Sequence, residues 1–115
     1  MAAGCVATTS TSVQPFQPSA SDLAQATELI AQKLKDPGSL QTRNIRGYRA
    51  ATGDRIICGE YNARNSFGGY SGFTGFYVRL TPQNTAKVVL SETDFALAEI
   101  GCNQAAAGSI NLPSG

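Results

Sequence analysis

The chain has no histidine and no tryptophan, and only three of its 115 residues are cysteine. Without histidine, neither a Ser–His nor a Cys–His nucleophile pair can form, which removes most hydrolase mechanisms. Zinc in proteins is held mainly by cysteine and histidine, so three cysteines alone argue against a tetrahedral zinc site within one chain. We therefore expect no metal and no cofactor.

Charged side chains are also scarce, at 15% of the chain, and the formal net charge is +1. Nucleic-acid-binding proteins usually carry a strongly basic face, so this balance gives no reason to expect a nucleic acid partner. The charges are nevertheless unevenly placed, because arginines gather in residues 43–64 and acidic residues in residues 92–99. This distribution indicates either two oppositely charged patches or an internal network of ion pairs.

The length predicts one domain. A domain of this size buries only about 60–65% of the surface that its unfolded chain exposes. Hydrophobic residues make up 42% of the sequence, so a core can form, but a covalent cross-link would add substantially to its stability.

The first twenty residues differ in composition from the rest. Residues 6–21 are uncharged and rich in Thr, Ser, Pro and Gln. This composition predicts a flexible tether rather than a packed element. Directly before them, the small residues Ala2, Ala3 and Gly4 precede Cys5, as in the lipobox of bacterial lipoproteins. Small side chains before the cleavage point suit the narrow cleft of a signal peptidase.

A lipoprotein signal normally also has a charged start and an apolar run of about 7–15 residues before the cysteine. Both are missing here, and Ala stands where Leu is more usual, so we expect such a signal to precede this sequence in the precursor. The interpretation predicts that Cys5 carries the lipid and holds the protein in the periplasmic part of a bacterial cell envelope. The alternative is an ordinary cysteine in a frayed end. No other segment is long enough to span a membrane.

Residues 21–36, SDLAQATELIAQKLKD, have the pattern of an amphipathic helix. Ser21 or Asp22 is a suitable N-cap, and Pro37 disfavours helical geometry in the residue before it. The apolar positions recur at helical spacing: Leu23, Ala26, Ile30 and Leu34. The pattern predicts a helix that lies with its apolar side on a sheet.

Four later runs have the composition of strands, and turn residues separate them: 43–50, 55–63, 73–80 and 87–90. Strands that follow one another in this way should pair as an antiparallel meander. Residues 92–107 follow, and Ser91 with Asp94 resembles a helix capping box. We favour a second helix here, although the alternation of Phe95 and Leu97 permits a strand.

The predicted fold class is therefore α+β. An N-terminal helix, and a second helix near the C-terminus, pack on a four-stranded antiparallel meander sheet. The predicted domain covers residues 21–108, after a lipobox-like start and tether over residues 1–20. Residues 109–115 are expected to form a loose tail.

If Cys5 carries a lipid, Cys58 and Cys102 remain as one pair. An exported protein meets an oxidising compartment, where such a pair normally forms a disulfide. The alternative is that Cys58 is a reactive thiol, but Ile56 and Ile57 beside it indicate burial. We predict the disulfide.

The least ordinary segment is CGEYNARNSFGGYSGF, residues 58–73. Its candidate binding residues are Asn62, Arg64, Asn65, Phe67, Gly68, Gly69 and Tyr70. They admit four interpretations: a structural hairpin with no ligand, an anion-binding nest, a site for a sugar chain such as peptidoglycan, and a protein interface anchored by aromatic residues. The two glycines suit a tight reversal, because glycine tolerates positive φ.

Two groups of residues, Lys35-Asp36-Pro37-x-Ser39 with Arg43, and the loop motif CGxxNARNSFGGYxGF of residues 58–73, resemble a group of small bacterial envelope proteins. Many members of that group are predicted lipoproteins. The resemblance covers about residues 22–80. It implies an envelope location, a helix-plus-sheet domain and a later cysteine corresponding to Cys102. It implies no activity, cofactor or catalytic residue.

An enzyme without histidine would need paired carboxylates, and Asp54 and Glu60 are the acids nearest the loop. Six residues apart on one strand, they would lie about 20 Å apart, whereas glycosidase pairs lie within about 10 Å. We therefore expect a non-catalytic lipoprotein that binds a protein or a cell-wall component through residues 62–73. The alternative is an immunity or inhibitor lipoprotein that neutralises a toxin or a lytic enzyme.

Overall fold

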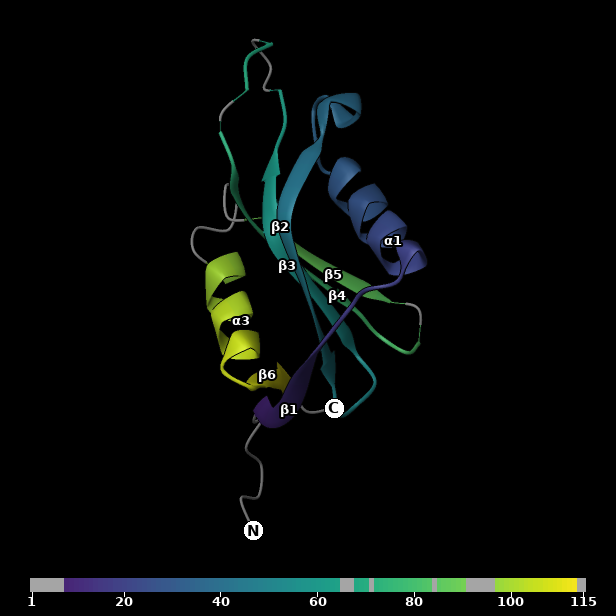
Figure 1. Ribbon diagram of the computed structural model, residues 1–115, viewed down its shortest axis with the longest axis vertical. Coiled ribbons are helices and arrows are strands. Elements are labelled where there is room, and N and C mark those ends of the chain that lie inside the picture. The colour runs from purple at the N-terminus through teal and green to yellow at the C-terminus, as the bar shows by residue number, and fades with distance from the viewer. Residues whose placement is uncertain (1–7, 65–67, 71, 84, 91–96, 114–115) are drawn as a thin grey trace.

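The structure, a computed structural model, describes residues 8–64, 68–70, 72–83, 85–90 and 97–113 (Figure 1). Within these ranges the chain forms strands, two α-helices and one short 3-10 helix. In chain order the elements are β1 (Thr8–Phe16), α1 (Ala20–Ala31), η1 (Pro37–Ser39), β2 (Gln41–Ala50), β3 (Arg55–Asn62), β4 (Thr74–Leu80), β5 (Ala86–Leu90), α3 (Leu97–Ala106) and β6 (Ser109–Pro113).

The described strands form one sheet in the order β5-β4-β3-β2-β1-β6, and each neighbouring pair is antiparallel. The four strands expected from the sequence are β2 to β5, and their pairing as an antiparallel meander is confirmed. The tight turn at Thr52-Gly53 joins β2 to β3, and Gly53 has φ 93° there. Positive φ is readily adopted only by glycine, which explains the residue at this point.

The sheet is wider than the four strands predicted, because both ends of the described chain join it. Strand β1 pairs through its first half with β6 and through residues 13–16 with β2. The expectation of a tether at residues 8–16 and of a loose tail at residues 109–113 was therefore wrong. Neighbouring strands satisfy the backbone groups of these polar segments, and Val13 is buried in the core.

The two helices lie on opposite faces of the sheet, so that the molecule has three layers (Figure 1). Helix α1 packs with Ile57, Phe76 and other residues of one cluster, whereas α3 packs with Ile56 and Tyr77 on the other side. Strand β3 is consequently buried on both faces. This explains why the consecutive residues Ile56, Ile57 and Cys58 are all apolar and buried, as in strands that helices cover on both faces.

Helix α1 begins one residue before the predicted start, and Ser19 is its N-cap in place of Ser21 or Asp22. The Ser19 hydroxyl accepts a hydrogen bond from the Asp22 N–H at 3.0 Å, and the Asp22 carboxylate accepts one from the Ser19 N–H at 3.3 Å. This reciprocal capping box satisfies two N–H groups that a helix start otherwise leaves unpaired. The helix ends at Ala31 rather than continuing to residue 36.

Helix α3 confirms the prediction of a helix near the C-terminus for residues 97–106. Its buried residues Ala98, Cys102 and Ala105 share one face, as helical spacing requires. The predicted capping residues Ser91 and Asp94 lie outside the described residues. Gly108 follows the helix with φ 102°. Its carbonyl oxygen accepts a hydrogen bond from the Val13 N–H at 2.9 Å.

Candidate functional site

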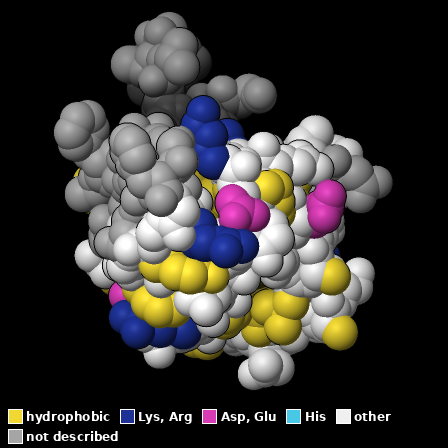
Figure 2. All heavy atoms as spheres, turned by 90° about the horizontal axis from the view of Figure 1, so that it is seen from above, with side chains coloured by type: hydrophobic (Ala, Val, Ile, Leu, Met, Phe, Trp, Pro, Cys, Tyr) yellow, Lys and Arg dark blue, Asp and Glu magenta, His cyan; other side chains and the backbone are white. Residues whose placement is uncertain are grey.

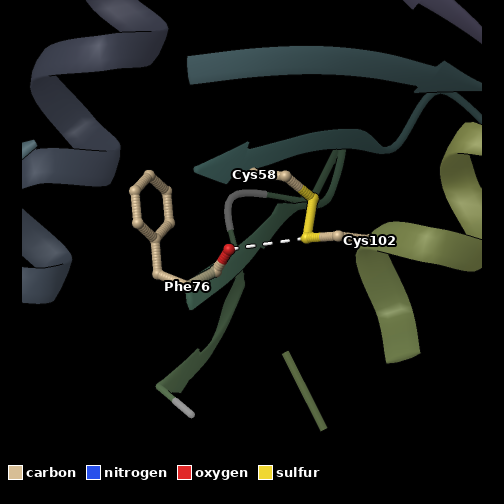
Figure 3. The surroundings of a disulfide bond; sticks show 3 residues. All are labelled: Cys58, Phe76 and Cys102. Carbon is tan, nitrogen blue, oxygen red and sulfur yellow. Dashed lines mark hydrogen bonds between the residues drawn. A yellow bond between two sulfur atoms is a disulfide. The ribbon is translucent and has the colours of Figure 1, made fainter. Parts of the chain in front are cut away.

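The predicted disulfide between Cys58 and Cys102 is present. Its sulfur atoms are 2.09 Å apart and its Cα atoms 5.9 Å apart, and it ties the central strand β3 to α3 (Figure 3). Both cysteines are buried. The Cys102 sulfur also lies 3.5 Å from the Phe76 carbonyl oxygen, a van der Waals contact, because a disulfide sulfur carries no proton. Cys58 is therefore a structural residue, and the third cysteine, Cys5, lies outside the described residues.

The two sequence motifs meet in space. The Arg64 guanidinium Nε lies 3.0 Å from the Asp36 carboxylate, and the Arg64 N–H donates to the Ser39 hydroxyl at 2.8 Å. That hydroxyl in turn donates to the Asp36 carbonyl oxygen at 2.7 Å, and the Tyr70 hydroxyl donates to the Ser39 carbonyl oxygen at 3.4 Å. We call Asp36, Ser39, Arg64 and Tyr70 the clasp, because they join η1 to the β3–β4 hairpin.

The other described loop residues also have structural partners or structural geometry. The Asn62 side-chain oxygen accepts a hydrogen bond from the Gly72 N–H at 3.1 Å across the neck of the hairpin. Gly68 and Gly72 have φ 83° and 99°, which glycine tolerates without strain. The predicted site residues Asn65 and Phe67 lie outside the described residues. Among the described loop residues, the large exposed side chains are those of Arg64, 47% exposed, and Tyr70, which is 48% exposed as a residue.

Most of the arginines are engaged within the molecule. The ion pairs are Arg43–Glu60, Arg55–Asp22, Arg64–Asp36 and Arg79–Asp54. Seen from above, Lys or Arg and Asp or Glu side chains lie directly beside each other (Figure 2). Within the described residues this supports an ion-pair network. Glu92 and Asp94, which belong to the acidic patch of the alternative, lie outside the described residues. Within the described part of the chain, Arg46 and Arg49 are exposed and in no ion pair, although Arg49 lies 4.8 Å from the centre of the Phe16 ring.

Strand β2 contains a bulge that the sequence did not reveal. Arg43 is opposite Glu60 and Arg46 is opposite Cys58, so two residues, Asn44 and Ile45, face the single residue Gly59. Asn44 has φ 56°, a left-handed conformation that asparagine adopts more readily than most residues. Bulges bend a strand and redirect its side chains, and they are common beside functional sites.

The bulge turns Asn44 toward Glu60. The Glu60 Oε1 atom accepts hydrogen bonds from Asn44 Nδ2 at 2.7 Å and from Arg43 Nε at 3.0 Å. These bonds, the Asn44 bond first, lower the pKa of Glu60 below its ordinary value of 4.5, and the charge of Arg46 adds a smaller effect. The Arg43 guanidinium also lies 3.8 Å from the centre of the Phe73 ring. Glu60 is therefore held as a carboxylate in a fixed position.

Beside this carboxylate lies a depression of about 650 Å³, which we call the hollow. It lies between the bulge, the ends of β3 and β4, and α3. Its described lining residues are Asn44, Ile45, Arg46, Gly59, Glu60, Thr74, Gly75, Phe76, Ala98, Cys102 and Asn103. Ile45 is 36% exposed at its edge. The candidate binding residues Asn62, Arg64 and Tyr70 are not among its described lining residues, whereas Glu60, considered above as a catalytic acid, is.

The structure does not bring the two candidate carboxylates together. Asp54 precedes β3 and is buried beside Arg79, at 3.3 Å, while Glu60 lies near the other end of the strand. Within the described ranges, no three or more cysteine or acidic side chains are grouped so that they could hold a metal. Over the same ranges, no helix is long and apolar enough to cross a membrane.

Sequence reasoning named the loop and missed the hollow. The only signal at Asn44-Ile45-Arg46 was an asparagine inside a strand-like run, and asparagine is one of the residues that tolerate positive φ.

The chain was also compared with protein-family models, with curated proteins and with solved structures, and none of the three comparisons gives a match.

Proposed function

We propose that this protein is a non-catalytic binding domain of the bacterial cell envelope that recognises a partner protein through the hollow. The observation that carries the proposal is the bulge at Asn44-Ile45. It places an apolar side chain and a fixed carboxylate, Glu60, at the edge of a depression large enough for a few partner side chains. Pockets of this size with a few fixed polar groups are the usual places for ligands.

The described loop residues support a structural role more than a binding role. The Arg64 side chain is in an ion pair within the clasp, and the Asn62 side chain accepts a hydrogen bond across the neck of the hairpin. A ligand at either residue would have to replace bonds that hold the loop. At the hollow, by contrast, Arg46 has no ion-pair partner among the described residues, and the second carboxylate oxygen of Glu60 has no hydrogen bond to a described group.

A protein segment fits the hollow better than a sugar chain does. Ile45 offers apolar area, Arg46 a cation, and the amides of Asn44 and Asn103 offer donors and acceptors. Arginine and buried apolar anchors dominate protein interfaces. Sugar rings commonly stack on an exposed aromatic face, but Phe76, the aromatic residue among the described lining, is buried.

The envelope location is part of the proposal. The buried Cys58–Cys102 disulfide supports an oxidising compartment, because such bonds persist outside the reducing cytosol. The lipobox-like residues before Cys5 support attachment through a lipid. Expressed behind a lipoprotein signal, the protein should be recovered with membranes, and Cys5→Ser should release it. If the wild-type protein and Cys5→Ser were both recovered with membranes, or both released from them, the result would contradict a lipid at Cys5.

The binding proposal is tested with two arginines of the same strand. Envelope extract is cross-linked to the wild-type domain, to Arg46→Glu and to Arg49→Glu, and captured proteins are compared. Both substitutions change the charge equally at exposed positions, but only Arg46 lines the hollow. We expect Arg46→Glu to lose a specific partner that wild type and Arg49→Glu retain. Equal capture by all three would contradict the proposal.

An immunity or inhibitor role remains the alternative function. It would use the same hollow for a toxin or a lytic enzyme. A surface patch of one sign that complements the target would favour this role, whereas four of the described arginines are paired with carboxylates.

A further inference from the structure

The position of β1 limits how far the domain can lie from a lipid on Cys5. Strand β1 begins at Thr8, so only two residues separate Cys5 from the sheet instead of the long tether expected from the sequence. A fully extended chain spans at most about 3.6 Å per residue, which puts Thr8 within about 11 Å of Cys5. This inference rests on the lipid attachment proposed above.

Ser12, in the middle of β1, lies beside turns at one end of the molecule, four residues along the chain from the start of the strand at Thr8. We call Ser12 and the turn residues 51–53, 81–83 and 106–108 the base. The Ala51 N–H donates to the Ser12 carbonyl oxygen at 2.9 Å, and the Gly108 carbonyl oxygen accepts from Val13 at the same distance. A side chain at Gly53 would meet Pro82 Cγ at 3.0 Å, so the two turns touch. Strands β1 and β6 lie at this lower end in Figure 1, and the upper end carries η1.

The base has the charge pattern of a surface that faces lipid. None of its residues is Asp, Glu, Lys or Arg, and the nearby Asp54 is buried in its ion pair with Arg79. Just beyond the base, Arg49 and Lys87 are exposed, and neither is in an ion pair with a described residue. Lys and Arg side chains near an anionic bilayer are attracted to it.

We propose that the base rests on an anionic lipid surface, so that the bulge, the hollow and the clasp face away from the membrane. The short link from Cys5 brings the base to the bilayer, and the uncharged turns can approach it without desolvating a charge. Arg49 and Lys87 then lie near the lipid headgroups. The partner of the hollow would meet it from the aqueous side.

The absence of tryptophan allows a direct test. Gln83→Trp places a single fluorophore in the base, and Gln41→Trp places one at the opposite end of β2; both glutamines are exposed. Each disulfide-bonded protein is coupled through Cys5, its remaining thiol, to maleimide phospholipid in anionic vesicles that contain a nitroxide headgroup lipid. We expect several-fold stronger quenching for Gln83→Trp. Equal quenching, or stronger quenching for Gln41→Trp, would overturn the orientation.

A second comparison tests the charges. Adding Arg49→Gln and Lys87→Gln to the Gln83→Trp protein should weaken its quenching on anionic vesicles and leave it unchanged on neutral ones. No weakening would overturn the role of the two cations. Because the lipid is coupled chemically, these results do not depend on whether cells acylate Cys5, which the fractionation of Cys5→Ser decides separately.

Discussion

Ser39 connects two segments that are far apart in the sequence. Its buried hydroxyl donates to Asp36 and accepts from the Arg64 N–H, and its carbonyl oxygen accepts from Tyr70. The four residues of the clasp therefore depend on each other to hold η1 against the hairpin. These contacts explain the residue types at the four positions without a ligand.

Replacing this hydroxyl tests the clasp. Ser39→Ala removes two partly buried hydrogen bonds, one with the Arg64 N–H and one with the Asp36 carbonyl oxygen. At about 0.5–1.5 kcal/mol for each bond, the two together contribute about 1–3 kcal/mol. We expect the free energy of unfolding, measured by denaturant titration, to fall by that amount. Ser21→Ala, at an exposed position on α1, should change it by less than about 0.5 kcal/mol. A loss at Ser39 no larger than the loss at Ser21 would contradict the clasp.

Glu60 should give the domain a measurable acid sensitivity. Hydrogen bonds from Asn44 and Arg43 lower its pKa in the folded state below 4.5, so the folded state binds this proton less tightly than the unfolded chain does. The stabilisation is present above pH 4.5 and is lost as the pH falls through the lowered pKa. We expect Glu60→Gln to flatten the pH dependence of the unfolding free energy below pH 4.5.

The matched control for this titration is Glu28→Gln. Glu28 is exposed on α1 and makes no ion pair with a described residue. The Glu28→Gln protein should keep the acid dependence of the wild type. If both variants behave alike, the bonds at Oε1 do not hold Glu60 in solution.

At the scale of elements, the central strands and the helices could be predicted because their apolar residues recur with the correct period. Strand β1 could not. Its sequence, TTSTSVQPF, resembles a tether in composition, and its stability comes from pairing with β6 and β2, which are distant in sequence. A bulge such as the one at Asn44 is equally hidden, because a register shift depends on the partner strand. The hollow therefore could not be predicted.

Val13 provides the test of β1. Its side chain is buried in the cluster that packs against α3, and Val13→Ala removes two methyl groups. At about 0.8 kcal/mol for each, plus a cavity term, the free energy of unfolding should fall by about 1–3 kcal/mol. Gln14→Ala, at the neighbouring exposed position, should have little effect. Equal stability of both variants would support a tether and contradict the strand.

At the scale of the whole molecule, the sheet separates two hydrophobic cores. The disulfide links the sheet to α3 across the core that contains Cys58 and Cys102. Cys58 and Cys102 are 44 residues apart in sequence. Loop-closure entropy for that separation corresponds to roughly 4 kcal/mol, a large part of the 5–15 kcal/mol or so that stabilises a typical small domain. The sequence allowed this pair to be predicted, because assigning Cys5 to a lipid left Cys58 and Cys102 as one pair, and because an exported protein meets an oxidising compartment.

Removing the cross-link should therefore affect the entire fold. We expect the double variant Cys58→Ala with Cys102→Ala to lose roughly 4 kcal/mol of unfolding free energy, measured by denaturant titration. Reduction of the wild-type protein should cause a similar loss, and the intact mass of the unreduced protein should correspond to two hydrogen atoms fewer than that of the reduced form. Free thiols at both positions in protein recovered from the envelope would contradict the structural role.

If the hollow at the bulge, rather than the loop, meets the partner, photo-cross-linking in cells should capture the partner at the hollow. In this experiment p-benzoylphenylalanine replaces either Ile45 or Tyr70. Both side chains are exposed, but only Ile45 borders the hollow. We predict a specific protein adduct from position 45 and none from position 70. An adduct from position 70 alone would contradict the account and return the binding site to the loop.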